Sequence, residues 1–305
     1  MQVREKTPLA PLTTFSIGGA AAYFVEAHHA QDIKEAYALA QEKALPVVIL
    51  GGGSNVVIPD DGLEAVVVKV ANKGITQSGS TLVVAAGETL LDVVRYAAGQ
   101  GLGGLEGLAG VPGTVGGAVR GNAGAFGVEI KDVLVSATVL DVESGDTKTY
   151  DVVECAFAYR TSYFKTHPGV VVLEATFALS HVASAVSEAK IMHTLAERHK
   201  RHIQDIKSAG SFFKNPVVSP GLRKLFKEEK GAESKEGRVP AGWLMDKAGL
   251  RGARVGDAVA SEYHTNYFLN AGDATAQEVR DLAAKAKAAV KEQFGVDLEE
   301  EAVVL

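Results

Sequence analysis

Apolar residues recur along the chain with two different periods, and each period predicts its own kind of element. Short apolar runs bounded by glycine or polar residues predict strands over residues 22–26, 46–50, 56–58, 64–70, 81–85, 133–140 and 169–177. Apolar positions three or four residues apart predict helices over residues 31–43, 89–100, 183–206 and 275–294. Because helices interrupt the strands irregularly, the pattern indicates an α+β fold rather than regular βαβ repeats.

Changes in the pattern divide the chain into three predicted domains, over residues 1–62, 63–206 and 207–305. The small residues of Lys207–Gly210 lead us to expect a hinge at the second boundary. Residues 220–240 are rich in Lys, Glu and Gly and show no apolar period after Phe226, so we expect an exposed loop there. Thr275 and Glu278 are spaced as a capping box, which predicts where the last helix begins.

The segment Gly107–Gly127 is dense in glycine, yet apolar residues such as Leu108, Val115 and Val119 recur within it. A flexible linker would carry Ser, Lys and Glu instead. Glycine lets a ligand approach the main-chain N–H groups with no Cβ in the way. Nucleotide diphosphates are bound in this way, so the segment predicts a nucleotide site.

A second glycine-rich loop, Gly51–Asn55, joins two predicted strands. Backbone amides with Ser54 and Asn55 beside them suit a pyrophosphate, and a plain tight turn is the alternative. The loop is not a Rossmann fingerprint, because the third glycine would fall at Val56 and a strand follows. Neither loop is followed by the Gly-Lys-Ser/Thr of a Walker A motif.

Composition narrows the class of protein. With 305 residues, 47% hydrophobic and 22% charged, the chain suits a globular protein of two or three domains. It has no signal-peptide pattern and no apolar run of about 18 residues, so we expect a soluble cytoplasmic protein that binds no membrane. The single cysteine, Cys155, excludes an internal disulfide and a cysteine-rich metal cluster, and we expect no metal. A net charge of −6 argues against nucleic acid as a partner, and the basic residues near 198–207 are typical of a solvated helix face.

Ordered blocks along almost the whole chain resemble the UDP-N-acetylenolpyruvoylglucosamine reductase family. They are Thr14–Gly19, Gly51–Val57, Gly110–Gly117, Asn122–Gly127, Tyr159–Lys165, Gly210–Pro216, Ala241–Leu244, Ser261–Asn266 and Leu298–Glu301. The resemblance implies two FAD-binding subdomains of the vanillyl-alcohol-oxidase type and a C-terminal substrate domain to which the tail returns. It also implies a role in peptidoglycan precursor synthesis, and so in cell wall biogenesis, cell shape and cell division.

The resemblance implies noncovalent FAD as the cofactor, with NADPH as the hydride donor. It assigns FAD binding to the two glycine-rich loops, namely Gly51, Gly52, Gly53, Ser54, Asn55, Gly110, Pro112, Gly113, Thr114, Gly116, Gly117, Asn122 and Gly124. Hydride passes from NADPH to FAD and then to the enolpyruvyl ether of UDP-N-acetylglucosamine-enolpyruvate. Negative charge then develops beside the substrate carboxylate and must be stabilised and protonated.

Three residues are the candidates for that task. Arg160 carries a permanently charged planar fork that suits a carboxylate, with a surface salt bridge as the alternative. Ser211 has a weakly acidic hydroxyl that suits protonation of a very basic carbanion, as the resemblance implies. Glu301 matches the last carboxylate of the family's tail block, where Glu300 stands in place of the usual proline. Glu299 is the neighbour with which it is most easily confused.

Substrate binding is assigned by resemblance to Lys214, Asn215 and Tyr159, with helix capping and a solvated charge as the alternatives for the first two. Of the other polar and aromatic side chains in the blocks, His264 suits a structural hydrogen bond and Trp243 a core position. The stretch between Arg160 and Ser211 is filled by a predicted strand and helix. We therefore expect the class of the family that lacks a lid carrying a tyrosine, with closure by movement of the third domain.

Two other functions stay open on the sequence. One is a different FAD-dependent oxidoreductase of the same superfamily, although neither glycine-rich loop contains a histidine or cysteine to tether the flavin. The other is a nonenzymatic nucleotide-binding module, in which Arg160, Ser211 and Glu301 share no task. Flavin absorbance that NADPH bleaches would separate the reductase from the binding module.

Overall fold

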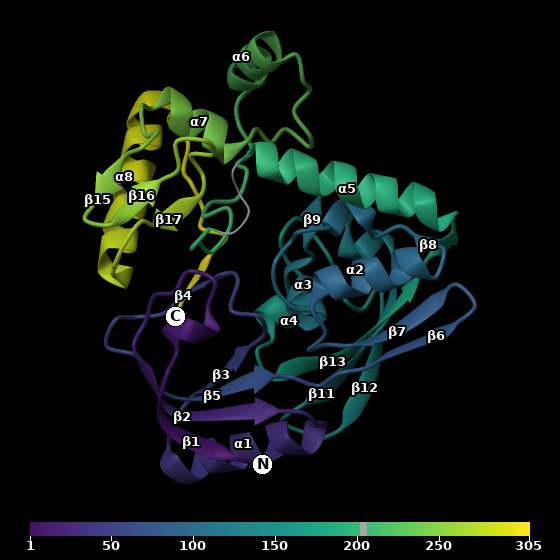
Figure 1. Cartoon of the computed structure of the whole chain (residues 1–305). Helices are drawn as coiled ribbons and strands as arrows, with labels where there is room; N and C mark the ends of the chain where they lie inside the picture. Colours follow the sequence, from purple (N-terminus) through teal and green to yellow (C-terminus); the bar gives the residue numbers. More distant parts are fainter. Residues whose placement is uncertain (202–205) are drawn as a thin grey trace. The chain divides into compact units, whose positions relative to one another are not determined.

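A computed structural model describes residues 1–201 and 206–305 of the chain (Figure 1). The described residues form two compact units, and each consists of several segments of the chain. Unit 1 contains Met1–Pro8, Ala20–Gly53 and Leu63–Lys200, whereas unit 2 contains Leu9–Gly19, Ser54–Gly62 and Arg201–Leu305. The mixture of helices and antiparallel and parallel strands confirms the predicted α+β class.

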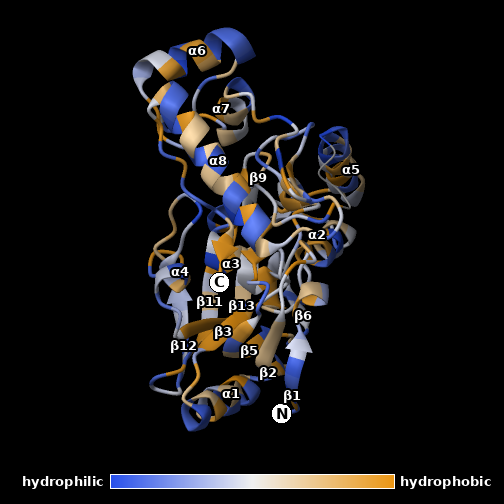
Figure 2. Ribbon diagram, turned by 90° about the vertical axis from the view of Figure 1, so that its left-hand side faces the viewer, coloured by the Kyte–Doolittle hydropathy of each residue, from blue (hydrophilic) through white to orange (hydrophobic). Residues whose placement is uncertain are grey.

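The first sheet of unit 1 has the strand order β1-β2-β5-β3. Its strands are β1 (Val3–Pro8), β2 (Ala20–Ala27), β3 (Val47–Leu50) and β5 (Leu63–Val70). β2 and β3 run parallel to β5, and β1 runs antiparallel to β2. β3 and β5 are strongly hydrophobic, as Figure 2 shows, which is typical of parallel strands buried on both faces. Helix α1 (Ala30–Lys43) packs on this sheet through Ile33 and Ala36.

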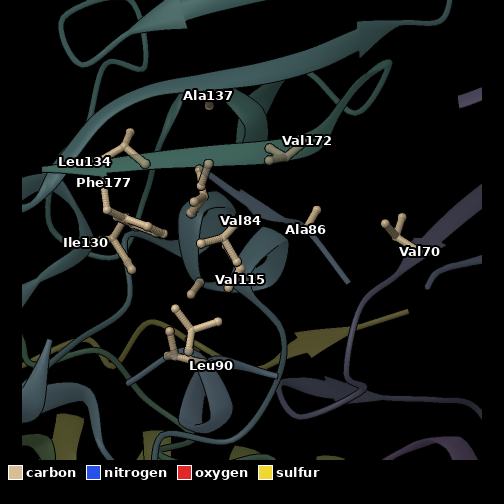
Figure 3. Close-up of a cluster of buried hydrophobic side chains, with 14 of the residues drawn as sticks. Val70, Val84, Ala86, Leu90, Val115, Ile130, Leu134, Ala137, Val172 and Phe177 are labelled. Atoms are coloured by element: carbon tan, nitrogen blue, oxygen red, sulfur yellow. The ribbon is translucent and has the colours of Figure 1, made fainter. Parts of the chain in front are cut away.

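The second sheet of unit 1 is antiparallel, with the order β12-β11-β13-β7-β6. Its strands are β6 (Ile75–Ser78), β7 (Thr81–Ala85), β11 (Leu134–Asp141), β12 (Thr147–Asp151) and β13 (Val170–Ala178). Val84, Val115, Ile130 and Phe177 form part of the core that this sheet shares with the nearby helices (Figure 3). Burial of this apolar surface supplies most of the stability of such a layer.

Helices and short strands cover the second sheet and form the glycine-rich region. The helices are η2 (Glu106–Leu108), η3 (Ile130–Asp132), α2 (Leu90–Gly99), α3 (Val115–Gly121), α4 (Tyr163–Thr166) and α5 (Ser184–Lys200). The short strands are β8 (Leu102–Gly103) with β14 (Ser180–His181), and β9 (Gly124–Ala125) with β10 (Val128–Glu129). The segment Gly107–Gly127 is therefore ordered structure and not a flexible linker.

Unit 2 is built around α8 (Ala276–Phe294), whose turns alternate between hydrophobic and hydrophilic residues (Figure 2). The capping box of Thr275 and Glu278 is present, as predicted. Helix α8 contacts α7 (Ala241–Lys247), β15 (Arg254–Val255) and β16 (Ala258–Ala260), and the unit also contains η1 (Ala10–Leu12), α6 (Pro220–Lys230) and β17 (Phe268–Asn270). β4 (Val56–Val57) pairs in parallel with β18 (Val303–Val304). Trp243 is buried in this unit, as expected.

The expected loop over residues 220–240 is wrong, because α6 occupies its first half. Ser219 caps the helix by accepting a hydrogen bond from Leu222 N, and Pro220 supplies the fixed φ that suits a first turn. Gly231 ends the helix with a φ of +63°. Leu222, Leu225 and Phe226 had the helical spacing, and the basic and acidic residues between them hid it.

The two units divide the chain differently from the three predicted domains. Leu9–Gly19 and Ser54–Gly62 belong with the C-terminal unit, since Gly19 N donates to Pro59 O and β4 pairs with β18. The expected hinge at Lys207–Gly210 is fixed within unit 2. Lys207 O accepts from Asn270 N at 2.9 Å, and Ser208 O accepts from Thr14 Oγ1 at 2.7 Å. Helix α5 ends at Lys200, and part of its predicted extension to residue 206 lies outside the described residues.

Candidate functional site

The two glycine-rich loops meet inside unit 1. A Cβ on Gly52 would lie 2.7 Å from the Cα of Gly113, and a Cβ on Gly51 would lie 2.7 Å from Thr114 Oγ1. Both distances are far too short for a real side chain, so the loops can approach only as glycine. Gly113 has a φ of +111°, which other residues rarely adopt. The sequence predicted the two loops separately, and the structure brings them together.

The glycine-rich segment Gly107–Gly127 leads into α3 and is fixed by hydrogen bonds and close packing within unit 1. Thr114 caps the helix by accepting from Gly117 N at 3.5 Å. Gly116 N donates to Ala86 O at 2.8 Å, and a Cβ on Gly116 would lie 2.9 Å from the Cβ of Ala86. Gly110 and Pro112 belong to the same stretch, upstream of Gly113. The loop therefore holds one backbone conformation.

The Gly51–Asn55 loop continues from unit 1 into unit 2 between Gly53 and Ser54. Within unit 2, Asn55 Nδ2 donates to Glu301 O at 3.1 Å, and Asn55 O accepts from Val303 N at 2.9 Å. The predicted cofactor residue Asn55 is thus bonded to the tail that carries the predicted catalytic residue Glu301. Sequence spacing gave no sign of this contact.

Asn122 is fully buried and its side-chain amide bonds to protein groups on both sides. Nδ2 donates to Glu129 Oε2 at 3.0 Å and to Ala158 O at 3.1 Å, while Oδ1 accepts from Lys131 N at 3.1 Å. Both amide hydrogens are therefore used within the protein. The amide gives Asn122 a role in the scaffold, whereas direct contact with FAD stays a prediction.

Arg160 lies in a two-residue turn closed by Ala158 and Thr161. These two residues exchange backbone hydrogen bonds of 3.1 and 3.2 Å. Arg160 has a φ of +56°, in the left-handed region that residues other than Gly, Asn and Asp rarely adopt. Its guanidinium donates from Nη2 to Gly124 O at 2.9 Å and lies 5.2 Å from the ring centre of Tyr159. Strained conformations of this kind cluster at functional sites.

Ser211 begins an extended segment in unit 2 that is paired on one side with the residues after Thr265. Ser211 forms a β-bridge with Tyr267, and Phe212 N donates to Asn266 O at 2.7 Å. The buried side chain of Asn266 accepts from Phe213 N at 2.9 Å and donates to Phe213 O at 2.8 Å. The Asn266 side chain therefore forms the hydrogen bonds that the backbone of a neighbouring strand would otherwise form with Phe213.

The C-terminal tail pairs with the other side of the Ser211 segment. Glu301 N donates to Phe212 O at 2.8 Å, Lys214 N donates to Glu299 O at 2.8 Å, and Phe213 forms a β-bridge with Glu300. The structure therefore brings Ser211 and Glu301, two of the three predicted catalytic residues, onto neighbouring strands.

The three tail glutamates differ in environment. Glu299 is 73% exposed and pairs with Lys214, and Glu300 Oε1 accepts from Lys287 Nζ at 2.7 Å. Glu301 is half-buried. Glu301 is thus less exposed than Glu299, and its role as the functional carboxylate stays a prediction. Glu299 also gives Lys214 a carboxylate partner.

Asn215 has a structural role that was weighed as the alternative to substrate binding. Its Oδ1 accepts from Ala241 N at 3.1 Å, at the start of α7, and its carbonyl accepts from Arg238 Nη1 at 3.0 Å. Helix α7 begins after Pro240, whose own side chain makes no cap. The side-chain oxygen of Asn215 therefore satisfies one of the first N–H groups of the helix.

Two residues that the sequence reasoning did not assign complete these surroundings. Asn266 supports the Ser211 segment, and Lys165 Nζ donates to Arg160 O at 3.0 Å. Both residues lie inside the ordered blocks, which was the available signal, yet spacing alone did not show what they contact.

The described part of the chain gives little support for a metal site or for a reactive cysteine. Among residues 1–201 and 206–305, no group of three or more His, Cys, Asp and Glu residues could hold a metal ion. Burial raises the pKa of the Cys155 thiol to about 12, and the carboxylates of Asp151 and Glu154 add to the shift. A thiol in this state is unreactive, since the thiolate is the nucleophile.

Comparison with known proteins accounts for both units. A model of the UDP-N-acetylenolpyruvoylglucosamine reductase C-terminal domain matches residues 201–305, and an FAD-binding domain model matches residues 21–151. UDP-N-acetylenolpyruvoylglucosamine reductase of Solibacter usitatus is 34% identical over 99% of this chain and 96% of its own length. The chain belongs to the UDP-N-acetylenolpyruvoylglucosamine reductase family.

Other members of the UDP-N-acetylenolpyruvoylglucosamine reductase family agree. The reductase of Pseudomonas putida is 36% identical over 99% of this chain and 98% of its own length. The crystal structure of the Thermus caldophilus reductase matches with a TM-score of 0.79 and 32% identity, covering 100% of this chain and 99% of the other. The predicted fold of FAD-binding subdomains with a C-terminal α+β domain is thereby confirmed, while the exact domain limits stay a prediction.

Within the described part of the chain, each helix is too short or too polar to cross a lipid bilayer.

Proposed function

We propose that this chain is a flavoenzyme that uses NADPH to reduce the enolpyruvyl ether of UDP-N-acetylglucosamine-enolpyruvate to UDP-N-acetylmuramate. Family membership supports the reaction class. One structural observation supports the proposal in addition to family membership. The Ser211 segment pairs with the tail that carries Glu301, and Glu301 N donates to Phe212 O at 2.8 Å. This pairing places a hydroxyl donor and a carboxylate on neighbouring strands.

FAD is assigned to the glycine-rich loops of unit 1, which approach each other so closely at Gly51, Gly52 and Gly113 that a side chain on Gly51 or Gly52 would collide with the other loop. Bound FAD supplies the redox chemistry, taking hydride from NADPH in one half-reaction and giving it to the substrate in the other. We assign its diphosphate to Gly51–Asn55 and Gly113–Gly117. The buried Cys155 and the absence of cysteine and histidine from the loops support noncovalent binding.

Arg160 is assigned to the substrate carboxylate. A guanidinium binds a carboxylate through two parallel hydrogen bonds, and it remains charged at every working pH. Hydride addition at the vinyl CH2 carbon places negative charge on the carbon next to that carboxylate. The positive charge of Arg160 stabilises this additional negative charge more strongly than it stabilises the ground state, which carries only the charge of the carboxylate, and the barrier is thereby lowered.

Ser211 is assigned to the proton. Its hydroxyl donates H⁺ to the carbon that carries the new charge, and the serine regains a proton from solvent. Glu301 is assigned to orient the enolic carboxylate or to protonate it, together with Arg160. Its half-buried position, compared with the exposed Glu299, supports this choice.

Lys214, Asn215 and Tyr159 are proposed to bind the substrate. Lys214 would exchange its carboxylate partner Glu299 for the diphosphate, which presents the same kind of charge. Tyr159 lies beside the Arg160 guanidinium. Asn215 would contribute its amide nitrogen, since its side-chain oxygen caps α7.

We place the chain in the class of the family that lacks a tyrosine lid. Tyr163 is the one tyrosine in the sequence between residues 161 and 206. Its ring stacks on His167 with centroids 3.7 Å apart and packs 5.3 Å from Tyr150. A tyrosine held in this way supports the absence of a mobile lid.

The absorption spectrum of the purified protein tests the function. Flavin bands that NADPH bleaches and the enolpyruvyl substrate restores are expected. Yellow colour should pass into the supernatant on acid precipitation, whereas colour retained in the pellet would indicate a covalent flavin and a different oxidoreductase. A protein that takes up no FAD would indicate a nonenzymatic module. We propose a cytoplasmic location and no nucleic-acid partner, in keeping with the charge of −6.

A further inference from the structure

The backbone of Arg160 is in a conformation that its own residue type disfavours. At a φ of +56° the Cβ crowds the following carbonyl, and only Gly, Asn and Asp visit this region readily. Such a conformation persists only when its surroundings fix it.

Side chains on both sides hold the turn by hydrogen bonds to the backbone. Lys165 Nζ donates to the carbonyl of Arg160 at 3.0 Å, and Asn122 Nδ2 donates to the carbonyl of Ala158 at 3.1 Å. Ser162, which is buried, donates from Oγ to Arg120 O at 2.7 Å. Hydrogen bonds from a charged donor such as Lys165 are stronger than neutral ones.

The same contacts join the turn to the glycine-rich loop. Asn122 and Arg120 belong to that loop, and the Arg160 guanidinium donates to Gly124 O at 2.9 Å. A Cβ on Gly124 would lie 3.2 Å from Arg160 Nη1 and 2.7 Å from the Cγ of Glu129, so glycine is needed for the guanidinium to lie there. The arginine and the loop are one hydrogen-bonded assembly.

We propose that Asn122 and Lys165 are positioning residues that set the Arg160 guanidinium against the glycine-rich loop. The inference rests on the proposed function for the role of Arg160 in the reaction. Asn122 acts through Ala158 and Lys165 through the carbonyl of Arg160, so neither needs to touch substrate. The loop assigned to FAD and the group assigned to the substrate carboxylate are thereby held in a fixed relation.

The test compares variants in which the new residue suits the backbone conformation at the substituted position. Asn122 has a φ of +45°, so Asn122→Gly removes the amide and keeps a residue suited to that conformation. Lys165→Met removes the donor and keeps the aliphatic stem, and Lys165→Arg restores a charged donor. Lys148→Met is the matched control, because Lys148 is an exposed lysine of the same unit that bonds to Asp141.

In rapid mixing, the holoenzymes should differ in one half-reaction. Asn122→Gly and Lys165→Met should slow reoxidation by the enolpyruvyl substrate about 10- to 100-fold, as expected for a misplaced binding group. Flavin reduction by NADPH should change less than about twofold, a split that general destabilisation would not produce. Lys165→Arg should recover most of the rate, and Lys148→Met should match the wild type.

A second readout does not depend on turnover. Phenylglyoxal modifies accessible arginines, and mass spectrometry of the peptide containing Arg160 measures the rate. Release of the guanidinium from Gly124 should raise that rate several-fold in Asn122→Gly and Lys165→Met, with Lys148→Met unchanged. Labelling at the wild-type rate in both variants overturns the proposal, whereas a wild type that lacks turnover overturns the proposed function and leaves the labelling result to decide the positioning.

Discussion

The Arg160 turn and the Ser211 segment carry neighbouring parts of the proposed chemistry, yet they are held in opposite ways. The Arg160 turn is closed by two backbone hydrogen bonds, but it is fixed to its surroundings by side chains, those of Asn122, Lys165 and the arginine itself. The Ser211 segment is fixed mainly by backbone pairing, with the tail on one side and Tyr267 on the other. A backbone pairing tolerates many residue types, whereas a side-chain clamp depends on each member.

The difference follows from what each group must do. An arginine that binds a carboxylate needs its planar fork aimed within a few tenths of an ångström, and side-chain hydrogen bonds give that directional control. A hydroxyl donor needs mainly the correct position along its extended segment, and the register of the backbone pairing sets that position. We therefore expect substitutions near Arg160 to slow the reaction. Substitutions near Ser211 should either slow proton transfer or lower the stability of unit 2.

The largest effect is expected at the hydroxyl. Ser211→Ala should slow reoxidation of the reduced flavin by substrate by roughly 10²- to 10⁴-fold, because a general acid contributes about that much. Backbone pairing keeps the segment in place, so flavin reduction by NADPH should stay near the wild-type rate. Stopped-flow absorbance measures both steps. An equal loss in the two half-reactions would contradict the assignment.

The tail offers a matched pair of glutamates. Glu301→Gln should slow the substrate half-reaction by about 10²-fold, at the lower end of what an acid–base group contributes. Glu299→Gln, at an exposed position paired with Lys214, should change the rate by less than about threefold, as is usual for exposed ion pairs. Single-turnover kinetics on both variants decides between them, and the reverse order would transfer the role to Glu299.

Sequence reasoning reached the elements and the individual residues, and it failed on the relations between them. Strands and long helices carry their own periodicity, so β5, β13 and α8 were predictable from local pattern. Helix α6 was missed because charges masked its spacing. The bond from Asn55 to Glu301 spans a sequence separation of 246 residues, and no local pattern encodes it. The left-handed backbone of Arg160 was equally hidden, because arginine is not a residue that signals such a turn.

Asn266 pairs with the Ser211 segment through its side chain, so substituting it tests how much that pairing contributes to stability. Asn266→Ala should leave Phe213 N and O unpaired in a buried place and lower the free energy of unfolding by about 2 to 3 kcal/mol, since each unsatisfied group costs about 1–3 kcal/mol. Asn266→Asp retains the acceptor for Phe213 N and separates the two contributions. Denaturant melts of the holoenzyme measure the change, and a loss below about 0.5 kcal/mol would mean that strand pairing alone suffices.

The smallest expected effect is a difference in stability between two variants of Arg160, and it isolates the strain at that residue. Arg160→Gly and Arg160→Ala both lose the guanidinium and its bond to Gly124, so both should slow reoxidation by substrate to the same extent. Only glycine relieves the left-handed backbone, so the glycine variant should be more stable than the alanine variant by about 1 kcal/mol. Thermal melts of the two proteins give the difference. Equal stability would show that the surroundings, and not the residue, determine the cost of the turn.

The parallel pairing of β4 with β18 has a consequence for how the protein is made. Val56 and Val57 are synthesised long before their partners Val303 and Val304. At about 5–20 residues per second, the sequence separation of 246 residues from Asn55 to Glu301 takes on the order of ten to fifty seconds to translate. During that interval the apolar stretch at Val56–Ile58 lacks its native strand partner. The pairing of β4 with β18, and the pairing of the Ser211 segment with the residues around Glu301, therefore form only after residues 299–304 have been synthesised.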